Sequence, residues 1–491
     1  MNEHLNPQLL KGLTHQYPLF YVQTREEQRL ERQLAQLSRT HYGDDRPVAT
    51  WSVARGFAGE QKPGDPLDMI QAIRHSDKDN FILLKDLPVL FEGNPVLVRA
   101  LRDLYRDLAG KNRYLFMSHP VLKLPEELKG EIWLVELHMP GEQEIFEFLK
   151  ENIASTGHDT GLAEDWYYQC ATAMKGLTLD EIWHLVQGWA TEQRFAIESV
   201  LPDIYADKTA ALQKEGCLEF ISKQVTMDQV GGLENLKQWV SSRKALFSRQ
   251  AFESGIPLPA GILFMGISGC GKSMASKVIA GAWNLPLVRL DMNLVMSGAY
   301  GSPEYVFDSA LKTAENIAPL VLWIDEMENS FGYDGTSTGG RSSIFSSFLT
   351  WMQEKPPQIF VVATANRIEK LPAEVIRKGR FDQLFFLDLP NDEERRAIFR
   401  IHIKAYGADP DTFNPNLLSI VTKAWSGAEI EQAVKAARIH AYQEGRMFDD
   451  KDITHASSQM VPLSKTMEEQ IKYLRQWSQT RATPASKKMA A

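Results

Sequence analysis

The sequence of 491 residues has few cysteines, no long apolar run and no excess of basic residues. Its three cysteines, Cys170, Cys217 and Cys270, lie far apart without metal-ligand spacing, which disfavours a zinc site or disulfide framework and suggests a reducing compartment. No segment approaches the roughly 18 consecutive apolar residues of a membrane span. The start, MNEHLNPQLLKGL, lacks the basic and apolar regions of a secretory signal. We therefore expect a cytoplasmic protein that has no membrane span.

The charge balance bears on possible partners. The chain has 63 acidic and 54 basic residues, a net charge of -9. Neutralising a nucleic-acid backbone normally requires clustered Lys and Arg. The composition thus disfavours nucleic acid as a partner, although it leaves a local basic patch open.

An apolar strand, a glycine-rich turn and a helix follow one another in AGILFMGISGCGKSMASKVIAGAW, residues 260–283. This order is typical of a phosphate-binding P-loop, because glycines let backbone N–H groups approach phosphate oxygens and the helix N-terminus adds partial positive charge. Lys272 is expected to reach the β- and γ-phosphates and Ser273 to bind Mg²⁺. The alternative is a chance glycine-rich turn. The predicted nucleotide contacts here are Gly266, Ser268, Gly269, Cys270, Gly271, Lys272, Ser273 and Met274.

Two further buried strands end in polar residues. PLVLWIDEME ends in Asp325, predicted to orient Mg²⁺, and Glu326, predicted to polarise the attacking water. QIFVVATANR ends at Asn366, whose amide can sense the γ-phosphate. The alternatives are an acidic strand end that faces solvent and ordinary loop capping by the amide. Beside a P-loop the nucleotide site is the better interpretation.

Two arginines precede the next strand, Arg377 and Arg380 in LPAEVIRKGRFDQLFFLDLP. Neither has an acidic neighbour in sequence that would explain both as a local ion pair. A planar, permanently charged guanidinium can stabilise transition-state charge on the γ-phosphate of a neighbouring subunit. A solvated surface pair is the alternative. We predict that both act as catalytic fingers.

GISGCGKS, LWIDE, ATANR and IRKGRFD, in this order and spacing, resemble the AAA family of the AAA+ superfamily over residues 225–460. The resemblance implies an α/β fold, with a parallel-sheet P-loop core and a helical lid. It also implies a ring, usually hexameric, that binds ATP and Mg²⁺ between subunits. In TMDQVGGLENLKQWV, which is similar to the segment preceding the family's core, Gly231 and Gly232 would lie near the adenine. WSGAEIEQAVKAARIHA resembles the lid helix, with a buried face predicted at Ile430, Val434, Ala437 and Ala441.

Three positions depart from the family pattern. Cys270 stands where most members have Thr, so its thiol either lies against the phosphates and is open to oxidation or is simply a small residue that fits. In the pore loop, LVMSGAYGSPE, Ala299 occupies the aromatic position and Tyr300 follows it, which leaves threading of unfolded chains open. Glu328 stands where the family more often has Asp, a change that we interpret as tolerated.

The first half of the sequence resembles the second half but lacks most of its predicted catalytic and phosphate-binding residues. KLPEELKGEIWLVELHMPGEQEIFEFL parallels KLPAEVIRKGRFDQLFFLDLPNDEERRAIF, and FILLKDLPVLF parallels LVLWIDEMENSF. Aligned on these anchors, Leu30 replaces Lys272, Leu87 replaces Glu326, His119 replaces Asn366, Gly130 and Trp133 replace Arg377 and Arg380, and Asp86 alone keeps the acid of Asp325. We predict a degenerate AAA-like module that cannot hydrolyse ATP. An unrelated α/β domain is the alternative, and strand order would separate the two.

The expected domains are a degenerate module over 1–200, a helical connector over 201–228, an ATP-binding α/β subdomain over 229–388, a helical lid over 389–457 and a C-terminal helix and tail over 458–491. In that last part Ile471, Leu474 and Trp477 form an amphipathic face that could dock on the ring or on a partner. Over its length the chain resembles AAA proteins of algal plastid genomes, cyanobacteria and other bacteria. For an alga, that resemblance implies a location in the plastid stroma.

These features predict an ATPase that assembles into a ring and couples Mg-ATP hydrolysis to remodelling of a protein partner. A nucleotide-gated scaffold with little turnover is one alternative. A DNA-directed ATPase is another, disfavoured by the acidic balance and by the lack of a recognisable nucleic-acid module. The sequence does not identify the partner.

Overall fold

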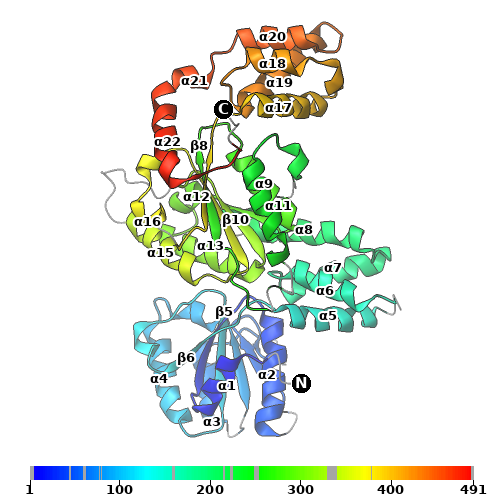
Figure 1. Ribbon diagram of the computed structural model, residues 1–491. Helices are drawn as coiled ribbons and strands as arrows, with labels where there is room; N and C mark the ends of the chain where they lie inside the picture. Colours follow the sequence, from blue (N-terminus) through cyan, green and yellow to red (C-terminus); the bar gives the residue numbers. More distant parts are fainter. Residues whose placement is uncertain are drawn as a thin grey trace. The chain divides into compact units, whose positions relative to one another are not determined.

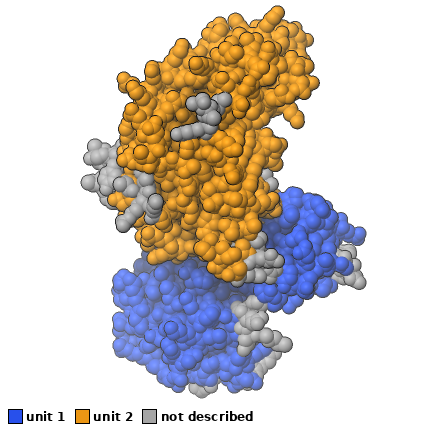
Figure 2. All heavy atoms as spheres, viewed as in Figure 1, with its two compact units in different colours: residues 1–204 blue, residues 205–491 orange. Residues whose placement is uncertain are grey.

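The computed structural model describes residues 5–487, except for 44–45, 59–61, 77, 79, 157–160, 214–215, 222–224, 248–250, 252–253, 329–339 and 377–378. The chain divides into two compact units, residues 1–204 and 205–491 (Figure 2). The predicted module boundary near residue 200 falls within helix α8 (Ile197–Gln213), so the chain passes between the units along a helix.

Unit 1 contains a six-stranded sheet in the order β3-β2-β4-β5-β1-β6, in which β3 is antiparallel and the other strands are parallel. Its strands are β1 (Leu19–Gln23), β2 (Ala49–Ser52), β3 (Gly56–Phe57), β4 (Phe81–Lys85), β5 (Tyr114–His119) and β6 (Ile132–Glu136). Its helices are α1 (Pro7–Thr14), α2 (Glu27–Tyr42), α3 (Pro66–His75), α4 (Pro95–Leu108), α5 (Glu142–Ser155), α6 (Glu164–Met174) and α7 (Leu179–Glu192).

Both faces of this sheet are buried, as expected for parallel strands covered by helices. Along β4, Phe81 and Leu83 pack into the apolar core on the side of α2, whereas Ile82 and Leu84 pack into the core on the side of α3 and α4. The alternation follows from the two-residue period of a strand. Helices α5, α6 and α7 follow the last strand as a separate helical group (Figure 1).

Unit 2 contains a seven-stranded sheet in the order β13-β12-β8-β11-β10-β9-β7, parallel except for β7. Its strands are β7 (Leu218–Ile221), β8 (Gly261–Gly266), β9 (Leu287–Leu290), β10 (Leu320–Ile324), β11 (Ile359–Ala365), β12 (Gln383–Leu387) and β13 (Thr483–Pro484). The helices of its α/β core are α9 (Glu234–Arg243), α11 (Lys272–Trp283), α12 (Met292–Met296), α13 (Pro303–Ile317), α15 (Gly340–Glu354) and α16 (Ala373–Ile376).

Four helices after β12 form the lid (Figure 1): α17 (Asp392–Ala405), α18 (Pro415–Val421), α19 (Gly427–Gln443) and α20 (Asp450–Ser458). The predicted inner face of α19 is confirmed, because Ile430, Val434, Ala437 and Ala441 are all fully buried. A capping box between Ser426 and Glu429 begins this helix. Among the helices that the structure describes, none is long and apolar enough to cross a membrane.

The C-terminal segment returns to the sheet of unit 2. Helices α21 (Leu463–Thr466) and α22 (Glu468–Arg481) precede β13, which pairs with β12 at the sheet edge. Ile471 and Leu474, two residues of the predicted apolar face, are buried in the core of the same unit. The predicted amphipathic helix therefore docks on its own α/β core.

Five parallel strands of each unit share one order, which in unit 2 leaves out the edge strand β13. Numbered by their place in the chain, they run fifth, first, fourth, third, second: β6-β1-β5-β4-β2 in unit 1 and β12-β8-β11-β10-β9 in unit 2. Strand order was the feature expected to separate a degenerate repeat from an unrelated α/β domain. The shared order supports the repeat.

Candidate nucleotide site

The P-loop lies between β8 and α11. Gly269 and Gly271 have φ angles of +77° and +92°, which residues with a side chain rarely adopt. Gly271 is the N-cap of α11 and provides no side-chain cap, so the first backbone N–H groups of the helix lack that partner. An uncapped helix N-terminus behind a glycine turn fits a phosphate group.

Lys272 is buried at the start of α11 and folds back on the loop. Its Nζ donates hydrogen bonds to the carbonyl oxygens of Gly266, over 3.0 Å, and Ile267, over 2.8 Å. Burial lowers the pKa of Lys272, while the charges of nearby acids, including Asp325 and Glu326, oppose that shift. An anion in the loop would relieve this burial penalty and attract the ammonium.

Asp325 and Glu326 follow β10, as predicted, and a residue that sequence reasoning missed joins them. The hydroxyl of Thr364, on β11, donates to Oδ1 of Asp325 over 2.5 Å and accepts the backbone N–H of Glu326 over 3.0 Å. Glu326 has a φ of +46°, so the chain turns sharply there and exposes its carboxylate. The Asp325 carboxylate and the Ser273 hydroxyl are the hard oxygen ligands that Mg²⁺ prefers.

Asn366 lies beside the predicted catalytic glutamate. Its Nδ2 donates to Oε1 of Glu326 over 3.2 Å. Glu328, which the sequence suggested was only a tolerated change, holds the same loop: its Oε1 accepts the backbone N–H groups of Asn366, over 2.8 Å, and Arg367, over 3.3 Å. Glu328 is only 3% exposed, and burial raises its pKa.

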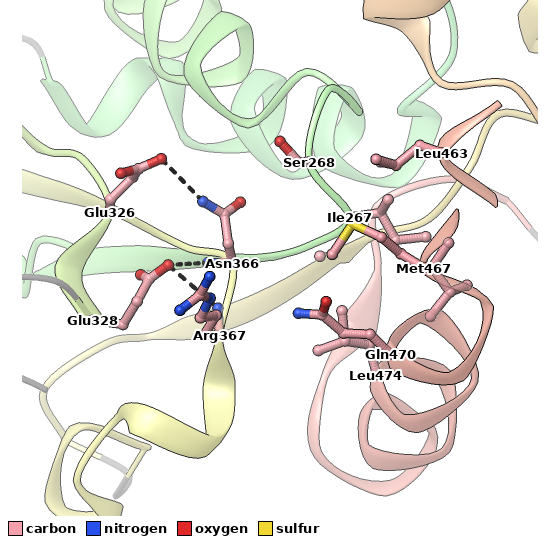
Figure 3. Close-up of a pocket in the computed structure, with 12 residues that line it drawn as sticks. Ile267, Ser268, Glu326, Glu328, Asn366, Arg367, Leu463, Met467, Gln470 and Leu474 are labelled. Atoms are coloured by element: carbon pink, nitrogen blue, oxygen red, sulfur yellow. Dashed lines mark hydrogen bonds between the residues drawn. The ribbon is translucent and has the colours of Figure 1, made fainter. Parts of the chain in front are cut away.

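A cavity of 370 Å³ opens between the P-loop, the ends of β10 and β11, and the C-terminal segment (Figure 3). Figure 3 shows Glu326 and Asn366 on one side of it and the residues of α21 and α22 on the other. The lining residues are Gly266, Ile267, Ser268, Glu326, Glu328, Asn366, Arg367, Leu463, Met467, Gln470, Ile471 and Leu474. The structure thus brings the predicted P-loop, catalytic and sensor residues to one site.

Of the two predicted arginine fingers, the structure describes only Arg380. Arg377 lies outside the described residues. Arg380 donates a hydrogen bond to the carbonyl oxygen of Glu374 on α16. Their predicted role concerns a neighbouring subunit, and it stays a prediction.

The glycines expected near the adenine face the lid. A Cβ at Gly231 would lie 2.9 Å from the side chain of Ile398, and one at Gly232 would lie 2.4 Å from Glu394 Oε1. Both neighbours belong to α17, so the segment that contains the two glycines packs against the first helix of the lid. A larger residue is disfavoured at Gly231 by the backbone of Ile398 and at Gly232 by its φ of +77°.

The pore-loop residues Ala299 and Tyr300 lie between α12 and α13, and both are exposed. The ring of Tyr300 packs over Gly216, where a Cβ would come within 2.6 Å of it. The contact holds the aromatic side chain against the segment that precedes β7.

Cys270 is the P-loop position where the sequence left two possibilities open. Burial raises the pKa of its thiol to about 12. Since thiolate is the form that oxidants attack, a protonated thiol favours a small residue that fits over a redox-sensitive one.

Unit 1 has the same strand-to-helix turn without a phosphate cradle. Only Thr24, Arg25 and Glu26 separate β1 from α2. The buried Glu26 carboxylate accepts hydrogen bonds from Arg29, over 2.7 Å, and from the backbone N–H of Leu179, over 2.8 Å. An ion pair within unit 1 therefore lies at the turn that corresponds in chain order to the P-loop.

The ends of β4 and β5 in unit 1 correspond to the ends of β10 and β11, which carry the predicted catalytic residues in unit 2. Asp86 follows β4 with a φ of +54°, and its carboxylate lies 2.8 Å from Nδ1 of His119 at the end of β5. By backbone conformation Asp86 corresponds to Glu326, one position away from the sequence alignment, which had placed it at Asp325. Leu30, which stands where the sequence alignment places Lys272, is fully buried.

Fold and site together define a P-loop protein of the AAA class. A model of the AAA family, the ATPase family associated with various cellular activities, matches residues 262–389. A model of the N-terminal domain of SpoVK-like AAA ATPases matches residues 6–137. The second match falls within the module predicted for residues 1–200. That this module is degenerate and cannot hydrolyse ATP stays a prediction.

Comparison with curated proteins narrows the class. The AAA domain-containing protein ycf46 of Pyropia yezoensis is 33% identical over 477 residues, which cover 95% of this chain and 96% of the relative. The ycf46 protein of Guillardia theta is 33% identical over 95% of this chain and 93% of its own length. The ATP-dependent zinc metalloprotease FtsH 1 of Salinibacter ruber is 28% identical over 64% of this chain and 47% of its length. The chain therefore belongs to the AAA ATPase family, and within it to the group of ycf46 AAA domain-containing proteins.

Proposed function

We propose that the protein is an ATPase that assembles into a ring and hydrolyses Mg-ATP at the site of unit 2. The observation that carries this proposal is the convergence of the P-loop, Glu326 and Asn366 at one cavity, with Asp325 held beside them by Thr364. AAA family membership supports nucleotide binding.

Unit 1 takes no part in this chemistry, because its Glu26–Arg29 ion pair lies at the turn that corresponds in chain order to the P-loop.

In this proposal each residue of the site has one task. The P-loop N–H groups and Lys272 bind the phosphates, while Ser273 and Asp325 hold Mg²⁺, which supplies charge neutralisation on the phosphate oxygens. Glu326 takes a proton from the attacking water, and Asn366 orients that water against the γ-phosphate. The hydrogen bonds that Thr364 and Glu328 make support this arrangement, since they hold both loops in place.

Ring assembly enters the proposal through Arg377 and Arg380. A guanidinium supplied by a neighbouring subunit would complete the site by stabilising charge in the transition state. We propose a homo-oligomer, with six subunits as the family suggests, that remodels a protein partner. The relatives in algae and the low cysteine content support a location in the cytoplasm or, in an alga, the plastid stroma.

Size-exclusion chromatography with light scattering on Glu326→Gln, with and without Mg-ATP, tests the assembly. This variant should bind ATP without consuming it, so the proposal predicts a shift to a ring when Mg-ATP is added. Lys272→Ala is the matched control and should not shift. A Glu326→Gln protein that stays monomeric in saturating Mg-ATP would leave the arginines without a target and contradict the ring.

A further inference from the structure

The C-terminal segment is fixed to unit 2 at its far end. The guanidinium of Arg475, on α22, forms a bidentate pair with Asp388, with Nε 2.9 Å and Nη2 2.8 Å from carboxylate oxygens. Beyond α22, the side chain of Asn235 donates to the carbonyl oxygens of Pro484 and Ser486, each over 3.0 Å. Helix α22 is thus held against the α/β core.

The near end of the same segment is bound to the lid. The backbone N–H of Leu463 donates to Oε1 of Glu429 over 2.6 Å. Glu429 belongs to the capping box of α19, and the next contact along that turn joins Ala428 N–H to the carbonyl oxygen of Gly269 in the P-loop over 3.0 Å. The segment therefore connects the lid, the P-loop and the core around one cavity.

Gln470 is the polar residue that this segment contributes to the cavity. The other lining residues from α21 and α22 that the structure describes are apolar: Leu463, Met467, Ile471 and Leu474. In Figure 3 the half-buried Gln470 amide points toward the side of the cavity formed by Asn366 and Arg367. An amide can donate and accept hydrogen bonds without adding charge, which suits a group that faces both phosphate and water.

We propose that Gln470 is a positioning residue for hydrolysis, which faces the γ-phosphate end of bound ATP opposite Asn366. The inference rests on the proposed function and extends it: the C-terminal helix contributes to the site from within the same chain. Through Arg475 and Leu463, the position of Gln470 depends on both the core and the lid.

Gln470→Ala tests the role, with Gln476→Ala as the matched control, because Gln476 is exposed on the same helix. Losing one hydrogen bond at a charged group should lower kcat about tenfold. The KM for ATP should change less than about twofold, since most binding contacts remain. Equal kcat for Gln470→Ala, Gln476→Ala and the wild type would overturn the inference while leaving the ATPase proposal standing.

Gln470→Glu supplies a second measurement that needs no turnover. A carboxylate facing the γ-phosphate should weaken ATP binding about tenfold more than ADP binding, whereas Gln476→Glu should leave the ratio unchanged. Equal weakening of ATP and ADP would place Gln470 away from the γ-phosphate and overturn the inference. If the wild type binds ATP but does not hydrolyse it, the proposed function is contradicted. The inference about Gln470 is still tested, because the relative loss of ATP and ADP affinity in Gln470→Glu does not require hydrolysis.

Discussion

Oε1 of Glu328 lies 2.8 Å from the backbone nitrogen of Asn366, whose N–H it accepts, and it also accepts the N–H of Arg367. Glu328→Ala should free both N–H groups and loosen the sensor loop. The loop would lose two hydrogen bonds to a carboxylate, each worth about 1–3 kcal/mol, and would hold Asn366 less firmly, so kcat should fall roughly ten- to a hundredfold. ATP affinity should change little, because Glu328 is two residues beyond Glu326 and outside the P-loop.

Glu328→Gln is the control for that experiment, since its amide oxygen can still accept both bonds. It should retain most of the wild-type kcat. Steady-state ATPase assays and nucleotide titrations on the two variants measure both quantities. A Glu328→Ala protein with wild-type kcat would show that the loop keeps its position without this carboxylate.

Unit 1 should bind no nucleotide. The structure predicts one ATP per chain for the wild type and none for Lys272→Ala, as measured by isothermal titration. Arg29→Ala should leave this stoichiometry unchanged. It should nevertheless destabilise unit 1 by about 3–5 kcal/mol, because it leaves Glu26 charged and buried.

Arg99→Ala is the matched control for stability, because Arg99 forms an exposed pair with Asp103. Its cost should be below about 1 kcal/mol. Urea denaturation of the three proteins compares them. Two bound nucleotides per wild-type chain would refute the degenerate site of unit 1.

Much of the site could be predicted from sequence because its functional residues stand directly beside apolar strands or helices and follow one another in a fixed order along the chain. Lys272, Asp325, Glu326 and Asn366 each end or begin an apolar element, so their meeting at one sheet edge follows from parallel topology. The shared strand order of the two units was expected from the same patterns.

The remaining site residues depend on tertiary packing. Thr364 and Glu328 act through hydrogen bonds across neighbouring strands, and a small polar residue in a strand gives no signal of its partner. Gln470 lies more than a hundred residues beyond Asn366, and only the docking of α22 brings the two to one cavity. The amphipathic pattern predicted the helix but not the surface that it covers.

Cys270 should resist modification. Because burial raises the pKa of its thiol to about 12, only a very small fraction is thiolate at pH 8. Iodoacetamide should label the native protein slowly, and Cys270→Thr should keep ATPase activity within about twofold, since both side chains are small. Rapid labelling of Cys270 at pH 8, identified by mass spectrometry, would contradict the raised pKa of its thiol.

Lys355 should make stability depend on pH. Burial lowers its pKa from 10.5 to about 8, an effect that Asp382 partly opposes. Between pH 8 and 10.5 the unfolded chain therefore binds more protons at this group than the folded chain does, so its contribution to the unfolding free energy rises with pH. Above 10.5 the contribution is complete, and it is lost as the pH falls through 8.

Lys355→Met removes this titration. Relative to the wild type, the variant should lose about 3 kcal/mol of unfolding free energy between pH 7 and 10.5, apart from any constant cost of the lost bond to Ile359. Urea unfolding of both proteins across this range gives the difference. A constant difference at all pH values would show that Lys355 titrates alike in the folded and unfolded chains.

The most direct test of the central claim is the steady-state rate of phosphate release by the wild type and by Glu326→Gln at saturating Mg-ATP, with ATP binding measured in parallel. We predict that both proteins bind ATP with similar affinity and that the variant hydrolyses it at least about a hundredfold more slowly, the scale of a lost general base. Equal rates for the two proteins would contradict the assignment of Glu326 and the catalytic site built around it.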